Sequence, residues 1–416
     1  MKFSNVSRRG FVQAMGVAGA AGAVALTGCG NSASGGSGDG SGSGAGSDGG
    51  KFMMGGIGPL TGGAAIYGNA CKNAAEIAVA EIDGTDSQFK FDLKFEDDEH
   101  NAEKSVNAFN TLKDWGMQML VGTTTTAPCI AVAEEASNDN IFVLTPSASS
   151  TDVIGGQPDA QGNTTTARRP NVFQMCFTDP NQGTASAKYI SEQKLGTKVG
   201  IIYDSSDAYS TGIDQKFLTE AKQVNLEVVA NEAFTADSAT DFSTQLNNCK
   251  NAGADILFLP VYYTPASIIL KQANDMGYAP KFFGVDGMDG ILAMEGFDTS
   301  LAEGVMLLTP FNADADDDRT KAFVAAYKDK TGEVPNQFAA DAYDCVYALQ
   351  AALEKGGCTP DMSASDVCDK LVEVFTSGDF TFSGLTGDTM AWSDTGEVSK
   401  EPKGMVIQGG QYVGME

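Results

Sequence analysis

Apolar and polar residues follow two periods along the chain, one typical of strands and the other of helices. Apolar residues alternate with polar ones from Phe89 to Phe95, the period of a strand with one buried face. From Ala70 to Ile82 they recur at three- and four-residue steps, the spacing of a helix stripe. Further short apolar segments, separated by helix-length segments, lie at 119–121, 141–144, 199–203, 227–230, 255–260 and 282–285. Two such series predict an α/β fold with two doubly wound lobes.

The first thirty residues have the features of an export signal. Basic residues at positions 2, 8 and 9 precede an apolar stretch over 15–26, which is too short to span about 30 Å of hydrocarbon. Arg8-Arg9 resembles the twin-arginine export motif, with ordinary Sec export as the alternative. The sequence LTGC that ends at Cys29 resembles a bacterial lipobox. We therefore expect residues 1–28 to be a signal peptide and Cys29 to carry a lipid anchor outside the cytoplasmic membrane.

A linker follows the expected lipid attachment. Residues 29–50 are, after the cysteine, almost entirely Gly, Ser, Ala, Asn and Asp, a composition that cannot offset the entropy of ordering. We expect this segment to be a flexible tether. About 365 residues remain after it, which exceeds the usual size of one core and favours two lobes.

The net charge argues against one class of partner. The chain carries −27, and removal of residues 1–28, with three basic and no acidic residues, leaves 24 basic and 54 acidic residues and a charge of −30. Phosphate backbones and anionic lipid surfaces would repel such a chain, so we expect no nucleic-acid partner. Seven cysteines remain beside Cys29, an odd number. Cys358 and Cys368 bracket a short loop and are the pair we expect to form a disulfide, and no cysteine spacing resembles a zinc site.

Three loops follow predicted strands, where ligands bind in sheets of this kind. The Gly-rich loop 55–63 superficially resembles a dinucleotide fingerprint, but its spacing is G-x-G-x-x-x-G with Pro59 inside the turn. The loop 122–128 holds four consecutive threonines before a predicted helix, where free N–H groups and the helix dipole favour a carboxylate. A simple helix cap would explain one threonine. The loop 145–150 carries another cluster of hydroxyl groups.

Catalytic and metal-binding patterns are weak. His100 is the single histidine and directly follows Asp97, Asp98 and Glu99, an arrangement that suggests a metal ligand but is more typical of a polar surface. The sequence has no H-E-x-x-H motif, no Walker A motif and no recognisable Ser-His-Asp set. We therefore expect no enzyme activity, no cofactor and no metal. A sensory ectodomain of the same fold remains an alternative, although such a receptor needs a membrane-spanning helix after the domain, and none is seen up to Glu416.

Six segments in order identify a family. The chain resembles the branched-chain amino-acid-binding proteins of ABC transporters over essentially everything after the linker. The segments that carry the resemblance are Gly58–Gly62 with Tyr67-Gly68, the threonine loop after Gly122, Leu144–Ser149, Val261–Tyr263 with Phe283–Gly287, Pro335–Leu353 and Phe382–Gly387.

The resemblance implies a type I periplasmic-binding fold, with two lobes joined by three crossovers and closing on ligand between them. It implies an N-terminal lobe of residues 51–175 plus 288–380 and a C-terminal lobe of residues 176–287 plus 381–416. The crossovers are expected near 176–179, 286–289 and 380–387. An ABC permease and an ATPase would be the partners, because the chain itself has no nucleotide site.

The resemblance also implies the binding residues. The ligand carboxylate would be held by Thr124 or Thr125 and by the segment Ser147 to Ser149. Tyr209 and one of the adjacent tyrosines 262 and 263 would close over the ligand, and Asp286 would pair with its ammonium. The family usually has Glu at this last position, so the identity of the amino acid stays open. The candidate set is Tyr67, Thr124, Thr125, Ser147, Ala148, Ser149, Tyr209, Tyr262, Tyr263 and Asp286.

Elementary electrostatics agrees with this assignment. A zwitterion that leaves water needs hydrogen-bond donors at one end and an anion at the other, because an unpaired buried charge is unstable. Adjacent residues at the end of a strand point to opposite faces, so we expect one of Tyr262 and Tyr263 in the core and the other in the pocket. Amide, urea-like and aromatic-acid solutes remain alternative ligands.

Overall fold

The computed structural model describes residues 50–157, 164 and 166–415. The predicted signal peptide, Cys29 and nearly all of the predicted linker therefore lie outside the described residues. Within the described part of the chain, no helix is both long and apolar enough to cross a bilayer.

The first sheet is entirely parallel and has the strand order β2-β1-β3-β4-β5. Its strands are β1 (Phe52–Gly58), β2 (Phe91–Asp97), β3 (Met119–Gly122), β4 (Phe142–Thr145) and β5 (Val172–Gln174). The intervening helices are α1 (Ala65–Asp83), α2 (Ala102–Trp115), α3 (Thr126–Asp139) and α4 (Thr151–Ile154). Three later helices are α9 (Asp318–Thr331), α10 (Gln337–Gly356) and α11 (Ala364–Phe375), of which α10 and α11 pack on this sheet.

Side chains alternate between the two faces of each strand, which explains the helical layers. In β3, Met119 and Val121 join α1, α10 and α11 in one core cluster, whereas Leu120 joins α2 and α3 in another. Both faces of the sheet are thereby buried, as expected for parallel strands.

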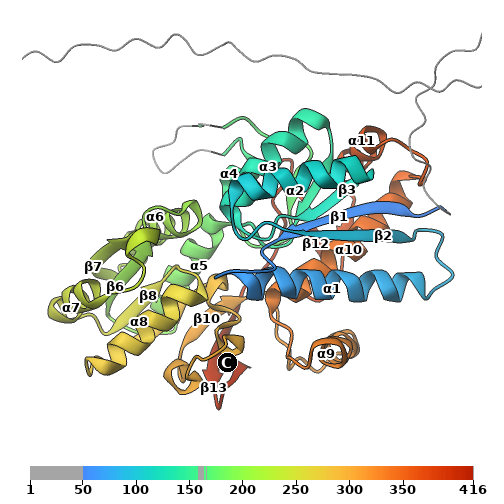
Figure 1. The fold of residues 1–416 in the computed structure, drawn as a ribbon. Helices are drawn as coiled ribbons and strands as arrows, with labels where there is room; N and C mark the ends of the chain where they lie inside the picture. Colours follow the sequence, from blue (N-terminus) through green and yellow to red (C-terminus); the bar gives the residue numbers. More distant parts are fainter. Residues whose placement is uncertain (1–49, 158–163, 165, 416) are drawn as a thin grey trace, which may run out of the picture. The chain divides into compact units, whose positions relative to one another are not determined.

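The second sheet has the order β14-β13-β10-β9-β8-β6-β7 and is a separate sheet (Figure 1). Its parallel strands are β6 (Lys198–Asp204), β7 (Glu227–Phe234), β8 (Ile256–Leu259), β9 (Lys281–Gly284) and β10 (Met306–Thr309). Antiparallel β13 (Lys403–Gln408) and β14 (Gln411–Gly414) extend one edge. The helices α5 (Asp179–Glu192) and α6 (Ala208–Gln223) cover one face, and α7 (Ser243–Ala252) and α8 (Tyr263–Asp275) the other. A separate pair of short strands, β11 (Thr381–Phe382) and β12 (Met390–Ala391), lies between α11 and β13 in the chain.

The prediction of an α/β fold with two doubly wound sheets is confirmed. The crossover predicted near residues 286–289 is wrong. The range 288–380 was expected in the first lobe, yet β10 within it pairs with β9 in the second sheet. The chain thus continues in the second sheet past the crossover expected near 286–289. The other lobe boundaries remain a prediction.

The expected disulfide between Cys358 and Cys368 is also wrong. Both residues are free thiols and buried, like the other cysteines of the described residues. Cys368 faces the core from α11, where its thiol lies 3.4 Å from Asn140 Oδ1 and burial raises its pKa to about 12.

The Gly-rich loop begins later than expected. Gly55 to Gly58 belong to β1 itself, and α1 already starts at Ala65. A Cβ on Gly58 would lie 2.2 Å from Thr124 Oγ1, and one on Gly56 would lie 2.2 Å from the Phe95 ring. These glycines therefore allow close internal packing, which accounts for them without a nucleotide.

Candidate binding site

The threonine loop joins the carboxyl end of β3 to the start of α3. Thr125 occupies the N-cap position of α3, but its side chain makes no capping bond; its hydroxyl lies 2.9 Å from His100 Nδ1. The Thr124 hydroxyl is buried and has no hydrogen-bond partner. The loop after β4 braces this segment, because the Ser147 hydroxyl donates to the Thr124 carbonyl (2.5 Å). The first amides of α3 and the loop hydroxyls thus form a group of potential donors at one end of the helix dipole.

Three side chains from the second sheet face this loop. Tyr209 lies in the first turn of α6, Tyr262 lies between β8 and α8, and Asp286 follows β9. The Tyr209 hydroxyl donates to Asp286 Oδ1 (2.6 Å), and the Gly287 amide donates to the same oxygen (2.7 Å). The rings of Tyr209 and Tyr262 stack at 4.8 Å with an interplanar angle of 4°. The Asp286 carboxylate is therefore held in one position beside two aromatic rings.

Tyr67 in α1 links the two sides. Its hydroxyl donates to the Gly287 carbonyl and accepts from the Tyr263 amide (3.1 Å). These groups surround a small cavity of about 10 Å³, room for roughly one water molecule. Its lining residues are Tyr67, Thr124, Thr125, Thr126, Ser147, Tyr209, Tyr262, Asp286, Gly287 and Phe338.

Comparison with known proteins identifies the family of the chain. A family model described as "Periplasmic binding protein" matches residues 52–399. The chain belongs to the periplasmic binding protein family. One relative is a Leu/Ile/Val-binding protein homologue of Brucella melitensis, 28% identical over 315 residues that cover 75% of this chain and 81% of the relative. The family and the names of such relatives are those of binding proteins, which confirms the prediction that the chain is not an enzyme.

Solved structures of other binding proteins share the fold. A leucine-binding protein of Thermotoga maritima matches with a TM-score of 0.76 and 22% identity, covering 88% of this chain and 98% of that one. An ABC-transporter solute-binding protein of R. palustris, solved in complex with benzoate, matches with a TM-score of 0.74 and 18% identity over 88% and 95% of the two chains.

In this periplasmic binding protein, seven of the ten candidate residues line the cavity. The three that do not are Ala148, Ser149 and Tyr263. Ala148 is buried, and its amide donates to Thr145 Oγ1 (3.0 Å). Ser149 is also buried, and its carbonyl accepts from the Asp179 amide (2.9 Å). Tyr263 packs edge-on against Tyr67 at 4.9 Å. Between the adjacent tyrosines, Tyr262 therefore faces the cavity and Tyr263 the core.

Several residues around the cavity were not predicted. Phe338 comes from α10, 76 positions after Tyr262, which lines the same cavity. His100 was expected on a polar surface, but it contacts Thr125 and lies edge-on to Tyr262 at 5.5 Å. Burial lowers the pKa of His100. Among the described residues, no group of three or more His, Cys, Asp and Glu side chains is arranged to hold a metal ion.

Buried acids dominate the electrostatics of the site. Burial raises the pKa of Asp286 to about 6. Asp179, at the start of α5, is buried as well, and burial together with the charge of Asp286 raises its pKa well above the usual range. No Lys or Arg belongs to the described lining of the cavity. The site therefore attracts a positively charged ligand group, and repels a negatively charged one, at the end where Asp286 lies.

Many polar atoms near the cavity lack partners. The buried atoms without a hydrogen bond include Thr124 Oγ1, Ser149 Oγ, Thr178 Oγ1, both carboxylate oxygens of Asp179 and Gln182 Nε2. Gln182 connects them to the site, because its Oε1 accepts from the Asp286 amide (3.3 Å). Buried polar groups are nearly always satisfied in folded proteins, so this concentration of unpaired atoms is typical of a site for a polar ligand.

Proposed function

We propose that this chain is the extracytoplasmic solute-binding component of an ABC importer and binds a branched-chain or related amino acid between its two sheets by hinge closure. The observation that carries the proposal is the opposition of a buried Asp286 carboxylate to the donor-rich start of α3. The family and the names of its relatives support the solute class.

The two ends of the proposed site differ in the charge they favour. On one side, Asp286 can bind an ammonium group while Tyr209 and the Gly287 amide hold its Oδ1. On the other, Thr124, Thr125 and Ser147 with the first amides of α3 can bind a carboxylate. Tyr67, Tyr262 and Phe338 supply apolar surface between them. This arrangement complements an α-amino acid with an apolar side chain.

The small volume of the cavity supports a site that opens to admit the ligand and closes around it. About 10 Å³ is far below the roughly 300–1,000 Å³ of ordinary ligand pockets. The contacts of Tyr67 with Gly287 and Tyr263 join α1 to loops of the second sheet. An amino acid can enter only if these contacts separate, so we propose that the two sheets move apart to admit it and close around it.

An aromatic acid is the main alternative, since the R. palustris relative binds benzoate. A benzoate ion has no positive group to pair with Asp286, and its own charge would be repelled there. Amide and urea-like solutes can use the hydroxyls but leave the Asp286 carboxylate without a cation. A ligand sensor would use the same site and would differ only in its partner.

A ligand screen tests the proposal. The mature protein is heated with leucine, isoleucine, valine, other amino acids, benzoate, acetamide or urea, and positives are confirmed by calorimetry. We expect an apolar amino acid to stabilise the fold by about 2.7 kcal/mol at 100-fold above its Kd. Stabilisation by benzoate or acetamide alone, with no amino acid active, would refute the proposal.

A further inference from the structure

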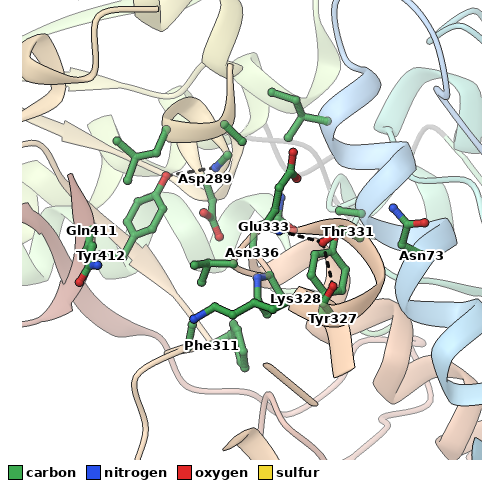
Figure 2. A pocket seen from close by; sticks show the side chains of 18 of the residues that line it. Asn73, Asp289, Phe311, Tyr327, Lys328, Thr331, Glu333, Asn336, Gln411 and Tyr412 are labelled. Carbon is green, nitrogen blue, oxygen red and sulfur yellow. Dashed lines mark hydrogen bonds between the residues drawn. The ribbon is translucent and has the colours of Figure 1, made fainter. Parts of the chain in front are cut away.

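A second cavity of about 680 Å³ lies apart from the proposed amino-acid site and shares no lining residue with it. It is bordered by α1, residues 289–293, the segment after β10, α9 with the residues that follow it, and the β13–β14 turn (Figure 2). Its volume falls within the range of ordinary small-molecule pockets.

Asp289 is the unusual residue of this cavity. Its side chain is buried, with 5% of the residue exposed, and Oδ2 accepts from the Gln337 amide (2.8 Å). Oδ1 is buried and has no hydrogen-bond partner, although the residue lines the cavity (Figure 2). Burial raises the pKa of Asp289 to about 6, so the group is ionised at neutral pH. A buried carboxylate oxygen without a donor is unstable unless something binds it.

The rest of the lining suits an apolar body with one positive group. Phe311, Tyr327 and Tyr412 provide aromatic surface. Of the two lysines in the lining, Lys330 is paired with Glu76 (2.9 Å), and Lys328 is exposed, so its charge is solvated. Asp289 is thus the desolvated charge of the cavity.

We propose that this cavity is a second ligand site that binds a small organic amine, with the ammonium on Asp289 Oδ1 and the apolar body against Phe311, Tyr327 and Tyr412. An ammonium donates the hydrogen bond that Oδ1 lacks and neutralises its charge. Aromatic faces add cation–π attraction to the same group.

Benzylamine is a suitable probe, because benzyl alcohol has nearly the same shape without the charge. We expect calorimetry to detect benzylamine binding to the wild-type protein, with an affinity unchanged in Asp286→Asn. Asp289→Asn should weaken it by roughly 30-fold or more, the loss typical of removing one partner of a buried charge pair. Benzyl alcohol should bind the wild type as weakly as benzylamine binds Asp289→Asn.

A second variant covers the event that Asp289→Asn does not fold. Ala293 is exposed at the cavity lining, so Ala293→Trp should narrow the cavity without disturbing the core and should also abolish benzylamine binding. The proposal is overturned if the wild type does not bind benzylamine, or if amine and alcohol bind equally. Loss of binding in Asp286→Asn with retention in Asp289→Asn would also overturn it, because the amine would then occupy the amino-acid site.

Discussion

The Asp286 carboxylate and the Thr125 hydroxyl differ in how easily neighbouring groups can replace them. Asp286 is buried at the cavity, whose described lining holds no second acid, whereas Thr125 lies among further hydroxyls and helix-start amides. For the amino acid that binds most tightly, Asp286→Ala should therefore cost about 3–5 kcal/mol of binding free energy. Thr125→Ala should cost about 1–3 kcal/mol. Calorimetry on both variants tests the order of the two losses.

Asp289→Asn is the matched control, because Asp289 is equally buried three residues away but does not line the amino-acid site. It should bind the amino acid like the wild type. If Asp286→Ala also binds like the wild type, the ligand carries no ammonium, and an uncharged amide becomes the leading candidate.

The raised pKa of Asp286 predicts how binding depends on pH. An ammonium ligand needs the ionised carboxylate, whose pKa is about 6 because of burial. Affinity should be constant above this pH and fall as the pH drops through 6, by about tenfold per unit once a proton must be released. Titrations between pH 4.5 and 8, chosen at roughly equal steps around this pKa, should show the loss, and Asp286→Asn should remove it. Binding that strengthens on acidification would instead identify an anionic ligand such as benzoate.

The role of a residue could be predicted where the residue follows closely after a strand, but not where segments that are distant in the sequence meet. Tyr262 and Tyr263 face different ways, as predicted, but strand alternation is not the reason, because β8 ends at Leu259 and Tyr263 begins α8. Phe338 and Asp179 carry no local signal, because their position depends on how α10 and α5 pack against other elements. His100 was misjudged for the same reason: its contact with Thr125 spans two loops.

At the scale of elements, periodicity predicted the type and order of most strands. The predicted segments 119–121 and 255–260 are short, apolar and bounded by predicted helices, and each contains an observed strand. The error concerned the sheet to which β10 belongs. The apolar segment Met306–Thr309 has the pattern of a buried strand whichever sheet it joins. Sheet membership is set by long-range pairing with β9 and β13, and local sequence does not encode it.

A buried ion pair fixes the segment before β13 to α10. Lys400 Nζ lies 2.5 Å from Asp341 Oδ1, and the two side chains are 0% and 3% exposed. Lys400→Met should lower the free energy of unfolding by about 3–5 kcal/mol, because the remaining carboxylate stays buried without its partner. Urea unfolding measures this loss. The double variant Lys400→Met/Asp341→Leu should recover most of it, since both charges are then absent.

The exposed pair of Lys271 with Asp275 provides the control. Lys271→Met should change stability by no more than about 0.5 kcal/mol. Equal effects of the two lysine substitutions would contradict a special role for the buried pair.

At the scale of the whole molecule, the two sheets contribute complementary halves of the proposed site. The first contributes hydroxyls and a helix start, and the second contributes Asp286 and stacked tyrosines. Neither half alone can pair both ends of a zwitterion. This division explains why the fold class could be predicted from local patterns, whereas the site emerged only from a family resemblance and from the contacts between the sheets.

The last prediction concerns how the molecule is held at the membrane. Cys29 lies outside the described residues, and the described helices include none that could cross a bilayer. With a net charge of −27 on the whole chain, attraction to anionic lipids cannot retain the protein. If lipid attachment at Cys29 is the anchor, Cys29→Ser should move the protein from the membrane fraction to the soluble extracytoplasmic fraction. Immunoblotting of fractionated cells measures this, with the buried Cys249→Ser as the cysteine control that should stay membrane-bound. Unchanged membrane association of Cys29→Ser would show that the anchor is not a lipid on this residue, since the apolar stretch over 15–26 is too short to replace it.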